Sequence, residues 1–141
     1  MLQHYDITAL FITLRLAATT TLILLVVGTP IAWWLANTRS RLRSLIEAII
    51  ALPLVLPPTV LGFYLLLAFS PDSPLGGAVA SLGLPSLAFS FTGLVLGSVI
   101  YSMPFVVQPL QNSFVSLGKR PLEVAATLGA STFDRFISVV L

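Results

Sequence analysis

Residues 16–38 read LAATTTLILLVVGTPIAWWLANT, a run of 23 residues without a charged side chain. About 20 consecutive apolar residues in a helix are enough to cross the hydrocarbon core of a bilayer. The stretch therefore predicts a transmembrane helix. A cleaved signal peptide is the alternative, but its apolar core is usually only about 7–15 residues long and ends at a small-residue cleavage site, which is missing before the arginines at 39–43.

The composition of the whole chain agrees with a membrane protein. Of the 141 residues, 57% are hydrophobic and 9% are charged, whereas soluble domains carry about 25% charged residues. This excludes a water-soluble globular enzyme and a disordered chain. With no cysteine and a single histidine, His4, the sequence predicts no disulfide, metal site or catalytic residue, and no cofactor. The basic residues flank apolar runs. The expected partner is therefore the lipid bilayer and not nucleic acid.

Two further uncharged intervals follow. One runs from Ala48 to Pro71 and predicts a second span at about 48–70. The other, Ser73–Gly118, has 46 residues, too many for one span. Its Gly-, Ser- and Pro-rich beginning, 73–86, is typical of a loop, so the third span is expected at about 88–110.

The remaining segment, 112–135, is expected in the cytoplasm, and residues 136–141 read as the start of a fourth span that breaks off. The predicted fold is therefore all-α: a polytopic transmembrane helix bundle over residues 1–141, forming one domain truncated at the C-terminus. Three complete spans are expected within it.

Basic residues set the expected orientation. Six of the seven lie beside the predicted inner ends of spans one and three, and only Arg15 lies on the opposite side. Because cytoplasmic loops are enriched in Lys and Arg, segments 39–47 and 112–135 are expected inside and the N-terminus outside. The six are Arg39, Arg41, Arg43, Lys119, Arg120 and Arg135.

Proline is the unusual feature of the second span. Pro57 and Pro58 remove backbone donors in mid-span, and the exposed carbonyls must face protein or water rather than lipid. Pro57, Pro58 and Thr59 are therefore candidates for a translocation path, although a simple kink is at least as compatible with the pattern. Since the three spans carry no Asp, Glu, Lys, Arg or His, proton relays and ion-coupled carriers are disfavoured.

Small residues also recur at a spacing of four, at Gly28, Ala32 and Ala36 and again at Gly93 and Gly97. Such ladders let helices approach closely. Packing within one subunit is the favoured interpretation over a dimer seam.

The segment 112–135 reads as two short helices. Pro121 suits the first turn of a helix, and Gly129 supplies a C-terminal stop. Ser131 and Asp134 have the spacing of a capping box that opens the next helix. The first helix, with its small-residue face, could dock into a partner's groove or rest on the membrane surface.

The residues EVAATLGAS at 123–131 resemble the E-A-A-x-x-x-G loop of ABC importer permeases. In that family the loop forms a coupling helix that sits in a cleft of the cytoplasmic ATPase. The resemblance implies that role for Glu123, Ala125, Ala126 and Gly129. The chain departs from the pattern at Val124, where the family has alanine.

A second stretch, LPLVLPPTVLG at 52–62, resembles the molybdate branch of the same family. Sulfate and thiosulfate permeases are similar but match the prolines less well. The resemblance implies a type I ABC importer permease in the cytoplasmic (inner) membrane of the cell, multi-pass, assembled as a homodimer of the full-length subunit. Its implied partners are cytoplasmic ABC ATPase subunits and an external oxyanion-binding protein.

The chain itself is not expected to be an enzyme, because Gly118-Lys119 lacks the remainder of a phosphate-binding P-loop. The resulting hypothesis is a molybdate permease subunit driven by a separate ATPase, with tungstate or sulfate/thiosulfate as alternative substrates. A channel or carrier fragment and a membrane anchor are the competing classes, and co-purification with an ATPase separates the permease from both.

Overall fold

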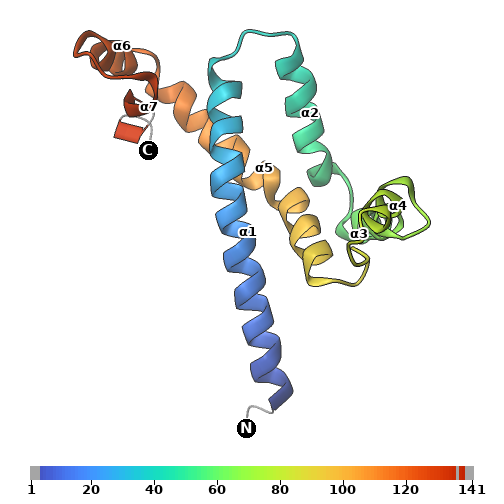
Figure 1. The fold of residues 1–141 in the computed structure, drawn as a ribbon. Coiled ribbons are helices and arrows are strands. Elements are labelled where there is room, and N and C mark those ends of the chain that lie inside the picture. Colours follow the sequence, from blue (N-terminus) through green and yellow to red (C-terminus); the bar gives the residue numbers. More distant parts are fainter. Residues whose placement is uncertain (1–3, 136, 139–141) are drawn as a thin grey trace.

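The computed structural model describes residues 4–135 and 137–138, and its secondary structure over these ranges is helical, without strands. The all-α fold class is thus confirmed. The predicted start of a fourth span, 136–141, lies outside the described residues apart from 137–138. In chain order the helices are α1 His4–Asn37, α2 Leu42–Val55, α3 Pro58–Phe69, α4 Pro74–Ser81, α5 Phe91–Leu117, α6 Arg120–Thr127 and α7 Thr132–Arg135 (Figure 1).

Two helices, α1 and α5, are each long and apolar enough to cross a membrane. With 34 and 27 residues they extend over about 51 and 40 Å. The helix α1 begins twelve residues before the expected 16–38 span, and α5 continues past the expected end at residue 110. The described part of the chain therefore contains two long candidate spans.

The helices α1 and α5 pack against each other and form the core. Ala32 and Leu35 of α1 are fully buried and share a cluster with Val107 and Phe114 of α5. A methyl group added at Gly28 would lie 3.2 Å from a Val106 side-chain atom, so the small residue permits close approach. The Gly28 ladder thus packs within one subunit, as the sequence favours.

The expected second span is broken. The helices α2 and α3 meet at an angle of 112°, and only as a bent pair do they have the length and apolarity of a third span. Leu56 and Pro57 are both extended, with ψ of 136° and 140°. A residue that precedes proline is pushed out of the helical region, so two successive prolines at 57 and 58 end one helix and start the next.

The interpretation of 73–86 as a loop is wrong over α4. The Ser73 hydroxyl accepts a 2.9 Å hydrogen bond from the Gly76 amide and donates to the Ser70 carbonyl at 2.7 Å. Pro74 follows in the first turn, where no amide donor is required. A serine cap followed by proline is a helix-start signal, and the glycines at 76 and 77 obscured it.

The helix α5 begins with the same arrangement. The Ser90 hydroxyl accepts a 3.0 Å hydrogen bond from the Gly93 amide and donates to the Leu87 carbonyl at 2.8 Å. A Cβ on Gly93 would lie 1.9 Å from that carbonyl oxygen. Gly93 therefore serves the turn before α5 rather than helix packing, whereas a Cβ on Gly97 would meet Leu65 of α3 at 3.6 Å.

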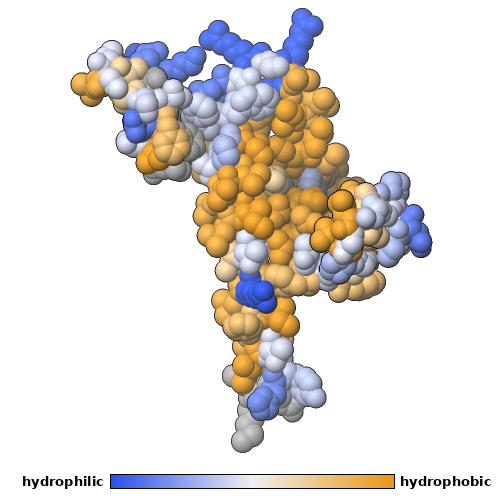
Figure 2. Space-filling model, viewed as in Figure 1, coloured by the Kyte–Doolittle hydropathy of each residue, from blue (hydrophilic) through white to orange (hydrophobic). Residues whose placement is uncertain are grey.

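Polar and apolar surfaces are separated along the molecule. Figure 2 shows hydrophobic residues over the middle of the helices and hydrophilic residues at the end that carries α6 and the connection between α1 and α2 (Figures 1 and 2). Because α1 and α5 run in the same direction, the basic segments that follow each of them lie at the same end. The distribution of Lys and Arg in the sequence predicts that segments 39–47 and 112–135 lie on the same side, and the two segments lie at the same end of the molecule.

Candidate functional site

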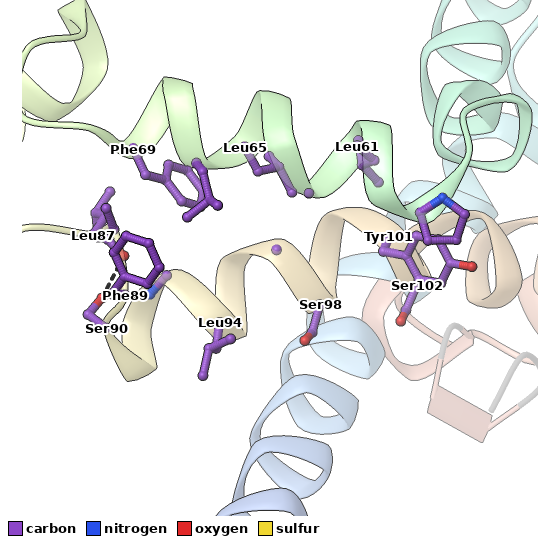
Figure 3. A pocket seen from close by; sticks show the side chains of 16 residues that line it. Leu61, Leu65, Phe69, Leu87, Phe89, Ser90, Leu94, Ser98, Tyr101 and Ser102 are labelled. Atoms are coloured by element: carbon purple, nitrogen blue, oxygen red, sulfur yellow. Dashed lines mark hydrogen bonds between the residues drawn. The ribbon is translucent and has the colours of Figure 1, made fainter.

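A groove of about 530 Å³ lies between α3 and α5 (Figure 3). The α3 wall is apolar and includes Leu61, Leu65 and Phe69. The α5 wall carries small residues and hydroxyls, among them Gly97 and Ser98. No residue among those that line the groove is charged, so it can accommodate apolar groups or a weakly held neutral or anionic solute. The full lining is Pro58, Leu61, Gly62, Leu65, Leu66, Phe69, Leu87, Ala88, Phe89, Ser90, Gly93, Leu94, Gly97, Ser98, Tyr101 and Ser102.

The three path candidates from the sequence are only partly brought to this groove. Pro58 lines it, while Pro57 and Thr59 are not among its lining residues. All three are exposed on the described chain, whereas Pro53, one turn earlier in α2, is buried. The break between α2 and α3 thus lies at one end of the groove rather than inside the helix core.

A polar junction joins α2 to α5 near the basic end of the molecule. The Gln111 side-chain amide donates a 2.5 Å hydrogen bond to Glu47, whose carboxylate also accepts one of 2.8 Å from Arg43. A second cavity of about 350 Å³ adjoins this junction, with Gln108 and Asn112 in its lining. Sequence reasoning missed the junction, since the Arg43–Glu47 spacing indicates a helical pair and nothing marks Gln111 as a partner.

The coupling candidates lie on α6 and just after it, at the end of the molecule beyond α5 (Figure 1). Glu123 and Ala126 are exposed, Ala125 is half-buried, and Gly129 is exposed. The Glu123 amide donates to the Lys119 carbonyl at 2.9 Å, which fixes the first turn of the helix. Glu123 is thus an exposed acidic residue within the first turn, where the helix dipole favours a negative charge.

The α6 surface also exposes apolar side chains. Val124 exposes 59% of its surface and Leu128 82%, at a spacing of four residues. Apolar residues spaced by four lie on one face of a helix. A short helix with an exposed, unpartnered apolar edge can contact another protein or the membrane surface.

Backbone geometry at the end of α6 agrees with the sequence. Gly129 has φ of +81°, the left-handed conformation that a helix-stop glycine is expected to adopt. The Ala130 amide donates to the Ala125 carbonyl at 3.1 Å, which closes the helix end. The predicted capping box is confirmed, because the Ser131 hydroxyl accepts from the Asp134 amide at 3.2 Å and the Asp134 carboxylate accepts from the Ser131 amide at 3.3 Å.

Comparison with known proteins places these features in a family context. Residues 28–141 match the family model described as binding-protein-dependent transport system inner membrane component. The match includes the core of α1 and α5, the groove, the Glu47–Gln111 junction and the whole of α6.

Individual relatives carry transport names. The molybdenum transport system permease protein ModB of Azotobacter vinelandii is 61% identical over 140 residues, 99% of this chain and 62% of that protein. The protein of the same name from Mycobacterium tuberculosis is 39% identical over 123 residues, 87% of this chain and 46% of its own length. The molybdate/tungstate transport system permease protein WtpB of Pyrococcus abyssi is 33% identical over 135 residues, 96% of this chain and 49% of its own length. The chain thus spans between about half and three fifths of the length of these relatives.

Proposed function

Because this chain belongs to the family of binding-protein-dependent transport system inner membrane components, we propose that it forms the membrane-spanning part of an ABC importer for molybdate. The observation that carries the substrate is the 61% identity, over 140 residues, to a protein named for molybdenum transport. A multi-pass position in the membrane follows from the family together with two long apolar helices. Tungstate is the second candidate substrate, favoured by the molybdate/tungstate name of the relative from Pyrococcus abyssi.

The chemistry of the helices supports a permease that does not itself select its substrate. The groove between α3 and α5 offers hydroxyls but no charged group that could hold a divalent oxyanion tightly. Selectivity is accordingly assigned to an external binding protein that delivers the oxyanion. The end of the groove at Pro58, and with it Pro57 and Thr59, remains the candidate segment of the translocation path.

Coupling to ATP hydrolysis is assigned to α6. Its exposed Glu123 and Ala126, the half-buried Ala125 and the turn at Gly129 would seat in a cleft of a separate cytoplasmic ATPase. Only Gly118 and Lys119 separate the end of α5 from the start of α6, so α6 is joined by a short connection to the helix that forms one wall of the groove. The chain supplies no nucleotide-hydrolysing group in this proposal, and the complete transporter contains two permease subunits and two ATPase subunits.

Orientation follows from the clustering of charge. The connection between α1 and α2 holds Arg39 and Arg41, and Arg43 follows in the first turn of α2. Lys119 and Arg120 stand at the start of α6, and both groups belong to the hydrophilic end of the molecule that Figure 2 shows. This end is assigned to the cytoplasm and the N-terminus to the outside.

Transport by the reconstituted importer tests the function. The permease containing this chain, its ATPase and its binding protein are placed in proteoliposomes, and ATP-dependent uptake of labelled molybdate is measured. Uptake is expected only with the binding protein present, with competition by unlabelled molybdate and tungstate in excess of that by sulfate. Equal uptake of a sugar or a metal cation, or uptake independent of ATP, would contradict the proposal.

A further inference from the structure

The helix α2 is joined to its neighbours by a non-helical connection at each end (Figure 1). Residues 38–41 connect it to α1. At the other end, Leu56 and Pro57 are extended and separate it from α3. Hinges are formed by a few residues at the ends of elements that absorb a change in φ and ψ. Rotation at these two connections would therefore move α2 as one rigid helix.

The helix α2 is packed less closely than α1. Of its 14 residues, Pro53 is buried, and Ile46 and Ile50 are partly buried against the cluster that α1 and α5 form. By contrast, Ala32 and Leu35 of α1 have no exposed surface. A segment with few buried apolar contacts separates from its neighbours at a lower free-energy cost than the core does. The helix α2 is thus the part of this helix group that separates most readily.

The second cavity, of about 350 Å³, lies where α2 meets α1 and α5. Its apolar lining includes Ile50 and Ala51 from α2, and Val107 from α5. Val107 has only 1% of its surface exposed although it lines the cavity. Surfaces that face a void lose the van der Waals contacts that close packing supplies. The cavity therefore weakens the apolar attachment of α2 at this place.

A hydrogen bond fastens α2 to α5 beside the cavity. The Gln111 amide donates it to the Glu47 carboxylate, and both side chains belong to the cavity lining. Arg43, one turn earlier on α2, holds the same carboxylate oxygen at 2.8 Å. The acceptor is thus fixed to α2, and the donor is a residue of α5 with 9% of its surface exposed. One such bond has a modest net free energy, so it can hold two helices together and still break reversibly.

We propose that α2 is a hinged cover over this cavity, latched to α5 by the hydrogen bond between Glu47 and Gln111. When the bond breaks, α2 turns about residues 38–41 and 56–57 and exposes the cavity to water at the basic end of the molecule. The contacts between α1 and α5 stay unchanged in this movement. The proposal concerns the movement of α2 and does not depend on which substrate is transported.

Labelling of a buried cysteine tests the latch, because the chain has no native cysteine. The reporter is Val107→Cys, at the buried residue in the cavity lining. The control reporter is Leu24→Cys, which is 4% exposed, lies on α1 and is not among the lining residues. The full chain is purified in detergent at constant pH, and the rate of reaction with a water-soluble maleimide is measured.

Three changes alter the latch in each reporter background. Gln111→Glu places two carboxylates opposite each other and should release it. Glu47→Gln added to Gln111→Glu restores a pair of one amide and one carboxylate. Glu47→Ala, at a side chain that is 37% exposed, removes the bond without a new charge. It provides a second release variant should Gln111→Glu prevent folding.

Each release variant is expected to raise the labelling rate at Val107→Cys about tenfold, as the loss of one hydrogen bond to a charged group predicts. The exchanged pair should return the rate close to its original value, and the rate at Leu24→Cys should stay constant throughout. An unchanged rate at Val107→Cys would show that apolar packing alone holds α2 and would overturn the proposal. An equal rise at both reporters would show general loosening of the helices and overturn it as well. Circular dichroism of each variant confirms that the rates are compared on folded protein.

Discussion

The carboxylate of Glu47 on α2 accepts a 2.5 Å hydrogen bond from the side-chain amide of Gln111 on α5, across 64 residues of sequence. Gln111 is buried, whereas the Glu47 side chain keeps 37% of its surface exposed. The bond ties the helix that precedes the break at Pro57 to the helix that leads into α6. It is thus a polar link between α2 and α5.

Removal of this link should lower stability. Replacing Gln111 by leucine leaves the Glu47 carboxylate with Arg43 alone, and a hydrogen bond to a half-exposed charged group contributes about 1 kcal/mol. A double-mutant cycle of Glu47→Ala and Gln111→Ala, measured by thermal unfolding in detergent, should give a coupling energy of that size. Ser116→Ala is the matched control, since its hydroxyl bonds only within α5. Strictly additive losses for the pair would contradict the link.

The turn before α5 makes a sharp prediction about glycine. Gly93→Ala places a methyl group 1.9 Å from the Leu87 carbonyl oxygen, so the turn must open and the unfolding temperature should fall, for a cost of about 2 kcal/mol or more. Gly62→Ala is the control, because its added Cβ would meet no atom within 4 Å beyond its chain neighbours and the backbone of its own helix. In the interior of α3 this change should stabilise the helix by up to about 1 kcal/mol. Equal effects at the two positions would refute the role assigned to the turn.

Substitutions in the coupling region should separate assembly from insertion. Ala125→Trp adds bulk on α6, and Gly129→Val strains a residue whose φ is +81°. In the assembled importer both are expected to abolish ATPase association and uptake while membrane insertion stays intact. Glu123→Ala should be milder, because that side chain is exposed. Normal ATPase binding by both severe variants would mean that α6 only rests on the membrane surface.

Cysteine labelling can determine the orientation, because the chain has no native cysteine. With the basic end in the cytoplasm, Ser40→Cys should resist a membrane-impermeant maleimide in intact cells and react after permeabilisation. Ser81→Cys, at the end of α4, should react in intact cells. The opposite labelling pattern would reverse the proposed topology.

Local features were predictable from short stretches of sequence. The capping box of Ser131 and Asp134 and the positive φ of Gly129 depend on residues within one helical turn, so spacing and residue type suffice. The break at Pro57 and Pro58 was equally visible. The 112° bend between α2 and α3 was not predictable, because two prolines remove backbone donors without fixing the direction of the next helix.

Other features needed the three-dimensional arrangement. Gly93 and Gly97 look alike in sequence, yet one faces a carbonyl in its own turn and the other faces Leu65 on α3. The helix α4 was missed because glycine lowers helix propensity, while the cap at Ser73 overrides it locally.

The sequence by itself determined that the protein lies in a membrane, that it carries long stretches without charge and that six of its seven basic residues follow the first and third of the expected spans. These follow from composition and charge order, since the bilayer acts on each residue through its transfer free energy, whichever residues surround it. Only the tertiary structure decided that Glu47 meets Gln111, that α2 and α3 bend apart by 112° and that Arg15 stacks on Phe91. Contacts between distant residues depend on how helices cross, and the crossing is set by the packing of many side chains at once.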